Sequence, residues 1–172
     1  MGRHPKNPSK PTLIDMTMKT RPQIALLFLI TMLSGGLAQA DAEIIEERVI
    51  NPRLVELTIT TTAFTAPTKV HVNLPAGYAA EAGRRWPVTY YLAGTNHIYA
   101  DFNEQYGGEQ LTQSFDSLVV SPTGNSGYWS DWYNTGAFGP PKYETYVIDE
   151  LIPLIDGRFR TIPLRAARAL RT

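Results

Sequence analysis

Residues 117–122 read SLVVSP, and this short stretch decides the fold class. Leu118, Val119 and Val120 are consecutive apolar residues, so both faces of an extended chain would be apolar here, and Pro122 ends the run. A strand that is apolar on both faces is typical of the interior of a parallel sheet covered by helices on each side. The stretch therefore predicts an α/β protein.

Three further strands are predicted before this stretch. Residues 53–62 place Val55, Leu57 and Ile59 on one face, which is the two-residue period of a half-buried strand. The same alternation recurs in residues 70–74, with His71 on the polar face, and residues 87–92 form the third strand. Because only turns separate these strands, we expect them to form an antiparallel opening to the sheet.

A loop, a helix and another strand are predicted after Pro122. Residues 123–141 are rich in Gly, Asn, Ser, Trp and Tyr and show no periodicity, which favours a functional loop. In the helix that follows, the apolar residues recur at helical spacing, at Tyr143, Val147, Leu151 and Leu154. The acidic residues lie outside that stripe, at Glu144, Asp149 and Glu150. Pro153 is expected to kink the last turn. Residues 166–170 begin another strand. The pattern predicts an incomplete three-layer α/β sheet with antiparallel N-terminal strands, then parallel strands with a crossover helix.

Residues 1–40 have the pattern of a secretory signal peptide with an N-terminal extension. A basic stretch at 19–21 precedes an apolar run from Ile24 to Leu33, and Ala38-Gln39-Ala40 offers a small-x-small cleavage site before Asp41. The apolar run is about half of the roughly twenty residues that span a bilayer, so no permanent membrane anchor is expected. We expect the mature chain, residues 41–172, to be exported to the periplasm or the cell exterior.

The charge distribution argues against a nucleic-acid partner. The chain carries 16 basic and 16 acidic residues, but the leader holds five of the basic residues and one acid, which leaves the exported part acidic. The chain has no Cys, so the exported part must fold on its apolar core without disulfides.

Six ordered motifs resemble the esterase branch of the α/β-hydrolases, which includes secreted mycolyltransferases, feruloyl-type esterases and formylglutathione-hydrolase-like enzymes. The motifs are VNLPAGY at 72–78, WPVTYYLAG at 86–94, VVSPTG at 119–124, YWSDWY at 128–133, KYETY at 142–146 and DELIP at 149–153. The resemblance covers residues 53–170. It implies an α/β-hydrolase sheet, no cofactor or metal, and action on a small-molecule ester or acyl-sugar through an acyl-serine.

The resemblance also implies that the nucleophile lies beyond this chain. In the family, a strand like residues 168–170 leads into the Gly-x-Ser-x-Gly elbow, and the acidic residue and His of the triad follow the Ser. We therefore expect residues 41–172 to be the N-terminal part of an esterase domain that is inactive alone. A Ser-His-acid system built from His97, Asp101 and a serine such as Ser126 or Ser130 is the internal alternative.

The resemblance assigns an oxyanion-hole donor to the loop after residues 87–92. The donor is the backbone N–H of Thr95, and Gly94 permits close approach of the substrate or forms a plain turn. The family usually carries His or Asp before this glycine, whereas this chain has Ala93. In mycolyltransferases, the residue at the position of Asn96 would contact the substrate trehalose. Because Ala93 departs from the family pattern, the resemblance gives only weak support for the same contact at Asn96.

The loop at 128–133 concentrates aromatic side chains. Trp129, Trp132 and Tyr133, together with Tyr128, form either a wall for a sugar ring or acyl chain or the packing of a long loop. We expect Asp131 to hold this loop by hydrogen bonds to backbone N–H groups. A noncatalytic exported carbohydrate-binding module that uses residues 128–133 is the alternative function. His97, Asp101 and Glu104 lack a fourth partner, and no metal site is predicted.

Overall fold

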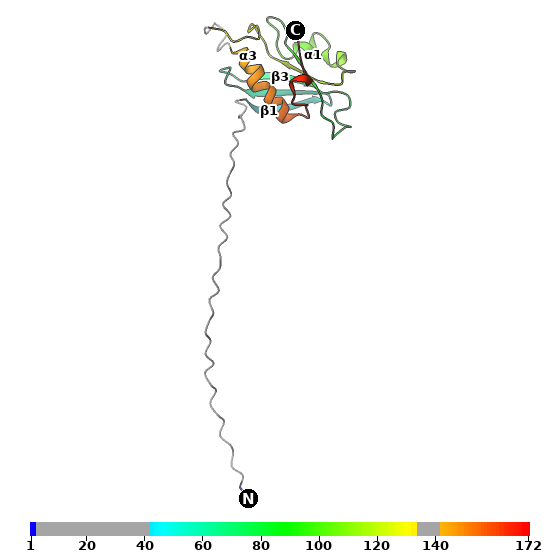
Figure 1. Cartoon of the computed structure of the whole chain (residues 1–172), viewed down its shortest axis with the longest axis vertical. Coiled ribbons are helices and arrows are strands. Elements are labelled where there is room, and N and C mark those ends of the chain that lie inside the picture. Colours follow the sequence, from blue (N-terminus) through cyan, green and yellow to red (C-terminus); the bar gives the residue numbers. More distant parts are fainter. Residues whose placement is uncertain (3–41, 134–141) are drawn as a thin grey trace. The chain divides into compact units, whose positions relative to one another are not determined.

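The computed structural model describes residues 1–2, 42–133 and 142–172, so the predicted signal peptide lies outside the described residues except for Met1 and Gly2. Residues 42–172 build one six-stranded mixed sheet in the order β1-β2-β3-β5-β4-β6 (Figure 1). The strands are β1 (Glu43–Asn51), β2 (Leu54–Thr60), β3 (Thr68–Asn73), β4 (Val88–Tyr91), β5 (Leu118–Pro122) and β6 (Arg168–Arg171). In the part of the chain that is described, none of the helices has the length and apolar character needed to cross a bilayer.

The antiparallel half of the sheet consists of β1, β2 and β3, and β3 also runs antiparallel to β5. The prediction that residues 87–92 belong to this half was wrong. β4 lies between β5 and β6 and is parallel to both. Parallel neighbours need long crossover connections, and the segments after β4 and after β5 supply them.

The edge strand β1 was not predicted. Its sequence, EIIEERVIN, carries four charged residues, and irregularities interrupt its pairing with β2 between Ile44 and Glu46 and between Val49 and Asn51. Each irregularity shifts the side-chain alternation by one position, so the two-residue period is lost. Ile45 and Val49 are consequently exposed on this edge.

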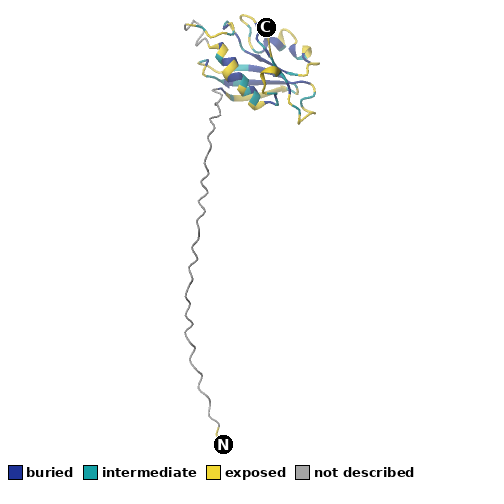
Figure 2. Ribbon diagram, in the orientation of Figure 1, coloured by how far each residue is buried: buried dark blue, intermediate teal, exposed yellow. Residues whose placement is uncertain are grey.

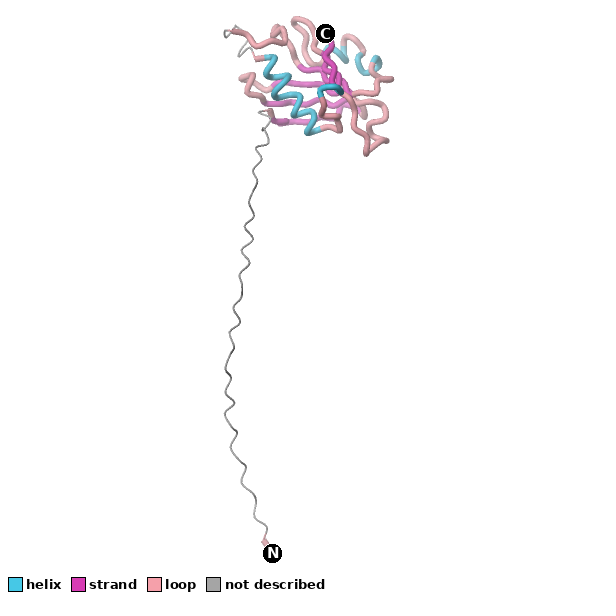
Figure 3. Tube along the Cα trace, viewed as in Figure 1, coloured by secondary structure: helices cyan, strands magenta, loops and turns pink. Residues whose placement is uncertain are grey.

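The two faces of the sheet are covered by different helices, which gives three layers (Figure 3). One face is covered by the helix of residues 143–158, and Figure 2 colours much of the sheet beneath it as buried. The buried side chains of the strands and of this helix form the core: Val55, Leu57, Ile59, Val70, Val72, Val88, Tyr90, Leu118, Val120, Tyr146, Leu151 and Ile155. The segment with α1 (Asp101–Glu104) and α2 (Gly108–Leu111) contacts the other face through Asn103. His71 lies on that face, which is the polar face of β3 as predicted, and is only 4% exposed there.

The predicted crossover helix is formed by α3 (Tyr143–Thr145), the π-helical turn η1 (Tyr146–Leu151) and α4 (Ile152–Arg158), which follow one another without a break. Instead of a kink at Pro153, the chain widens one turn earlier, and the Ile152 N–H donates to the Val147 carbonyl five residues back. A short 3₁₀ turn, η2 (Arg165–Ala167), then leads into β6.

The widened turn rotates Glu150 into the protein. Glu150 was predicted outside the buried stripe, but it is 2% exposed. Its carboxylate accepts hydrogen bonds from the Thr61 and Thr62 hydroxyls and from the Thr62 N–H (3.2 Å). These bonds tie the helix to the turn between β2 and β3.

We expect Glu150→Ala to lower the free energy of unfolding by about 1–3 kcal/mol, because the buried Glu150 carboxylate accepts three hydrogen bonds that the variant loses. Glu144→Ala, at an exposed position of the same helix, is the matched control and should change stability by less than about 0.5 kcal/mol. Urea unfolding of both variants measures the difference. Equal losses would show that the buried contacts of Glu150 do not stabilise the fold.

Candidate active site

A cavity of about 170 Å³ opens at the carboxyl ends of the central strands. Leu92, Ala93, Gly94 and Thr95 line it from the segment after β4, Asn125, Tyr128 and Trp129 from the loop after β5, and Thr172 from the end of β6. The connections that leave β4 and β5 cross opposite faces of the sheet. In α/β sheets, ligands bind at such a divergence of connections.

Thr95 lines this cavity, and its backbone N–H differs from the neighbouring N–H groups in its hydrogen bonding. The neighbouring N–H groups have partners, because the Asn96 N–H donates to the Asn125 carbonyl (2.8 Å) and the His97 N–H to the Gly94 carbonyl (3.3 Å). No residue in the described ranges accepts a hydrogen bond from the Thr95 N–H. Thr95 and Gly94, which resemblance assigned to the site, both line the cavity, whereas Asn96 does not line it and bonds to Asn125 and Ser126 instead.

Two asparagines join the loops on either side of the cavity. The Asn125 N–H donates to the His97 carbonyl (2.9 Å), which completes a reciprocal pair with the bond from Asn96. Asn96 and Asn125 both have left-handed backbones, with φ of 67° and 44°. The Ser126 hydroxyl also donates to Asn96 Oδ1 (2.9 Å). The role of Asn125 was not predicted, although asparagine in a loop is the residue other than glycine that best tolerates this conformation.

Trp129 forms one wall of the cavity and is fixed from two sides. Its indole N–H donates to the Ala93 carbonyl (2.8 Å). A Cβ atom on Gly124 would lie 2.3 Å from the indole ring, so position 124 has room for glycine alone. Tyr128 and Trp129 are both left-handed, with φ of 55° and 54°, and such strain in bulky residues is typical of functional loops.

The other aromatic residues of the loop lie around Tyr128. Its ring stacks on Trp132 with 6.3 Å between centroids, and the Trp132 indole N–H donates to the Gly127 carbonyl (2.9 Å). Tyr133 is fully exposed, and neither Trp132 nor Tyr133 lines the cavity. Of the predicted aromatic wall, Tyr128 and Trp129 reach the cavity.

A match to known proteins agrees with this geometry. The family model described as "Putative esterase" matches residues 61–170. This chain belongs to the esterase family. Esterase MT1326 and Esterase Rv1288 of Mycobacterium tuberculosis are each 30% identical to it over 129 residues, which are 74% of this chain and 28% of each relative. The chain thus spans less than a third of the length of these curated relatives.

Two solved structures share the fold. A ferulic acid esterase has a TM-score of 0.57 and 21% identity over 69% of this chain and 47% of its own. An S-formylglutathione hydrolase from Agrobacterium tumefaciens has a TM-score of 0.61 and 18% identity over 74% of this chain and 51% of its own. They confirm the predicted incomplete α/β-hydrolase sheet.

Asp131 joins the aromatic loop of this esterase-family chain to the crossover helix. Its carboxylate accepts hydrogen bonds from the N–H groups of Glu144 (3.0 Å) and Thr145 (3.1 Å) and from the Thr145 hydroxyl (2.6 Å). Partial burial opposes ionisation of Asp131, but the bonds from Thr145 and Glu144 outweigh it and lower its pKa. The prediction that Asp131 holds the loop is confirmed.

The structure pairs His97 with Asp101 but brings no serine to them. His97 Nδ1 lies 3.0 Å from Asp101 Oδ2, and His97 Nε2 lies 3.3 Å from the Tyr106 hydroxyl. Ser126 bonds to Asn96 instead. The internal Ser-His-acid alternative therefore has no hydrogen-bonded serine among the described residues. Nor do those residues contain a group of three His, Cys, Asp or Glu side chains arranged to hold a metal ion.

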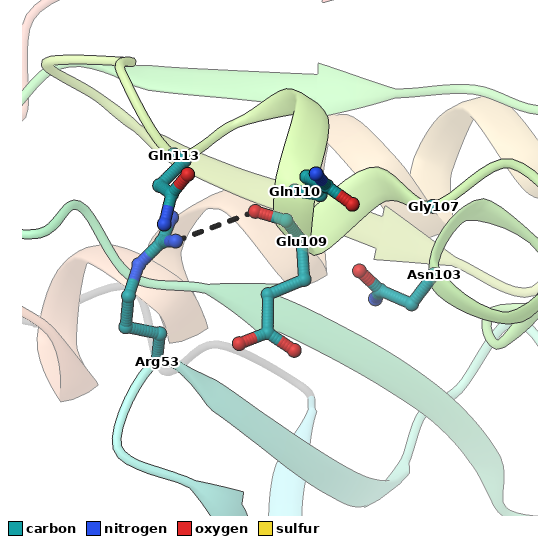
Figure 4. A pocket seen from close by; sticks show the side chains of 6 residues that line it. All are labelled: Arg53, Asn103, Gly107, Glu109, Gln110 and Gln113. Atoms are coloured by element: carbon teal, nitrogen blue, oxygen red, sulfur yellow. Dashed lines mark hydrogen bonds between the residues drawn. The ribbon is translucent and has the colours of Figure 1, made fainter.

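A second hollow, of about 380 Å³, lies beside α2 and is lined by polar groups (Figure 4). The Arg53 guanidinium donates to the carbonyls of Leu74 (3.0 Å), Glu109 (3.3 Å) and Thr112 (3.1 Å). The Glu109 carboxylate accepts a bond from Asn51 Nδ2 (3.0 Å). These groups hold α2 to the start of β2, so this hollow does not compete with the first cavity as the active site.

The left-handed backbone of Asn125, at the junction of the two loops, can be tested by substitution. We expect Asn125→Ala to lower the free energy of unfolding by about 1 kcal/mol, because alanine is disfavoured at positive φ. Asn125→Gly keeps the same backbone bonds without the strain and should be nearly neutral. Thermal unfolding of the two variants separates them. If alanine is tolerated as well as glycine, the left-handed conformation at residue 125 is wrong.

Proposed function

We propose that this chain supplies the oxyanion-stabilising part of an exported serine esterase or acyltransferase that acts on carboxylic esters through an acyl-serine. The observation that carries the proposal is the free Thr95 N–H in a cavity shared with Thr172 at the end of β6. Membership of the esterase family and an α/β-hydrolase sheet support the same activity. The leader pattern of residues 1–40 supports export.

The proposed role of Thr95 follows from where charge develops. When a serine attacks an ester, the carbonyl oxygen becomes an oxyanion, and a backbone donor placed about 2.7–3.1 Å from that position stabilises it. Leu92 and Trp129 would supply apolar walls for the bound ester beside this donor. Ala93 contributes no polar side chain, so we do not extend the trehalose contacts of mycolyltransferases to Asn96.

We propose that the nucleophile, its acid and its histidine are encoded after β6. In α/β-hydrolases the nucleophile elbow joins a sheet strand to the next helix, and β6 has the corresponding place beside β4. Translation of the DNA beyond codon 172 in all three frames should reveal Gly-x-Ser-x-Gly within about ten codons. Unrelated sequence in every frame would contradict this part of the proposal.

Activity measurements test the role of Thr95. The 172-residue chain alone should not cleave p-nitrophenyl acetate above the buffer rate, whereas the product extended by the downstream elbow and triad residues should. In that product, Thr95→Pro removes the N–H and should lower kcat by roughly 10²–10³-fold, while Thr95→Ala keeps the donor and the rate. Thermal unfolding confirms that both variants fold.

Two results would contradict the oxyanion role. If Thr95→Pro retained the full kcat, the donor would lie elsewhere. If the 172-residue chain cleaved the ester and lost that activity in Ser126→Ala, the nucleophile would lie within the described loop.

A noncatalytic carbohydrate-binding module is the second candidate, and the exposed Tyr128, which stacks on the partly buried Trp132, favours it. The exposed face of Tyr128, which is 68% exposed, could stack on a sugar ring. Isothermal titration against oligosaccharides should show binding that Trp132→Ala and Trp129→Ala abolish, if this function is correct. Tyr106→Ala, an exposed tyrosine outside the loop, is the control.

A further inference from the structure

A buried histidine connects the interior of the sheet to α1. His71 on β3 lies between Glu56 of β2 and Asn103 of α1, with 3.4 Å from Nε2 to Glu56 Oε2 and 3.1 Å from Nδ1 to Asn103 Nδ2. An amide nitrogen only donates, so His71 Nδ1 accepts this bond. The ring proton is therefore on Nε2, facing the Glu56 carboxylate, and His71 is neutral.

The charges around His71 keep Glu56 ionised. Glu56 also accepts bonds from Lys69 Nζ of β3 (2.8 Å) and from Arg48 of β1 (3.1 Å). Burial opposes ionisation of Glu56, but Lys69 and Arg48 outweigh it and lower its pKa to about 2. The Glu56 carboxylate is thus already paired with two cations, Lys69 and Arg48, while His71 is neutral.

Burial opposes a charge on His71, although the acidic side chains of Glu56 and Glu104 favour one. Tyr99 packs edge-on against the imidazole with 4.7 Å between ring centroids, and Glu104 of α1 is the further acidic group that acts on it. Ser121 of β5 stands opposite His71 in the ladder and is buried. Burial lowers the pKa of His71 despite the opposing effect of Glu56.

Asn103 holds α1 against the sheet. Its carboxamide pairs reciprocally with that of Asn73, which donates to Asn103 Oδ1 (2.7 Å) and accepts from Asn103 Nδ2 (3.2 Å). Every polar atom of the Asn103 side chain is thus bonded to β3. Asn103 also borders the polar hollow beside α2, which gives it space to turn away from the sheet (Figure 4).

The same helix holds the loop that carries Thr95. Asp101 accepts bonds from the Ile98 N–H (2.9 Å) and the His97 ring (3.0 Å). His97 in turn donates its backbone N–H to Gly94 (3.3 Å) and packs beside that residue. Contacts therefore run from His71 through α1 to the loop of residues 94–98.

A proton on His71 Nδ1 would break the hydrogen bond from Asn103 Nδ2, because two donors would then face each other across 3.1 Å. Turning the Asn103 carboxamide alone would restore an acceptor there but would break the reciprocal pair with Asn73. The pair would survive only if the Asn73 carboxamide, which is 1% exposed and packed between α1 and the sheet, turned at the same time. Protonation therefore favours separation of α1 from β3.

We propose that His71 is a positioning residue for the Thr95 loop: neutral His71 fastens α1 to the sheet, and protonated His71 releases it. Acid would thereby loosen the loop that presents the Thr95 N–H. The effect on catalysis rests on the proposed function, whereas the fastening itself can be measured without activity.

Amide hydrogen exchange of the full chain by NMR tests the fastening between pH 7.5 and 5. Once His71 begins to titrate, protection of the Ile98 amide should fall by up to roughly tenfold for each unit of pH. His71→Gln offers one donor and one acceptor without titrating, so it should keep the protection at every pH. His97→Gln removes the other imidazole near Ile98 but keeps a donor for Asp101, so it is the matched control and should show the same fall of protection with pH as the parent chain.

Two outcomes of this experiment would overturn the proposal. One is the same loss of protection in His71→Gln as in the parent chain. The other is abolition of the loss by His97→Gln, which would assign it to the His97–Asp101 pair. If His71→Gln does not fold, the ring nitrogen shifts of the parent chain decide, because a neutral His71 protonated on Nδ1 contradicts the bond from Asn103.

The free energy of unfolding of the parent chain should also decrease in acid. The folded chain protonates His71 less readily than the unfolded chain does, so the free energy of unfolding should fall as pH drops below the ordinary histidine pKa of 6.5. Glu56 contributes a separate loss only below its ordinary pKa of 4.5, toward about 2. His71→Gln should remove the first loss and keep the second in urea unfolding at each pH. A first loss that persists in His71→Gln would contradict the buried neutral histidine.

Discussion

The position of β4 between β5 and β6 is the constraint on which the site depends. Parallel pairing on both sides of β4 forces each connection to cross a face of the sheet, and the two connections take opposite faces. The Leu92 N–H extends the ladder by donating to the Arg171 carbonyl (2.7 Å). The first unpaired residues after β4 are therefore held beside the end of β6, and the cavity forms where the connections diverge.

The two faces of the sheet differ in the side chains that they bury. The face under the crossover helix is apolar and supplies the core, through residues such as Leu57, Val72 and Leu151. The opposite face buries Glu56, His71 and Asn73, whose bonds have directions that apolar contacts lack. Apolar burial stabilises the sheet, while the polar contacts set the position of α1 and of the loop beyond it.

The sequence predicted what depends on local periodicity, and missed what depends on neighbours. The strands β2, β3 and β5 follow alternating or continuous apolar runs, and the helix at 143–158 follows helical spacing. The pairing of β4 was missed because a short apolar strand looks the same in either direction. Glu150 was placed outside the buried stripe because a widened turn lies outside any local pattern. His71 was predicted on the polar face of its strand, but the segment that buries this face cannot be found from the strand's own residues. Thr95 and Gly94, which line the cavity, were assigned to a site through resemblance alone, since a backbone N–H leaves no mark in a side-chain sequence.

The π-helical turn at Tyr146–Leu151 holds one residue more than an α-helical turn would. A helix that gains one residue can keep both ends in place if one turn widens, so the insertion changes neither the strand before it nor the strand after it. Relatives without the extra residue would show a one-residue gap within this turn in a sequence alignment. In those relatives the acidic position equivalent to Glu150 would face a different direction, and the threonine pair at residues 61–62 would lose its reason to persist.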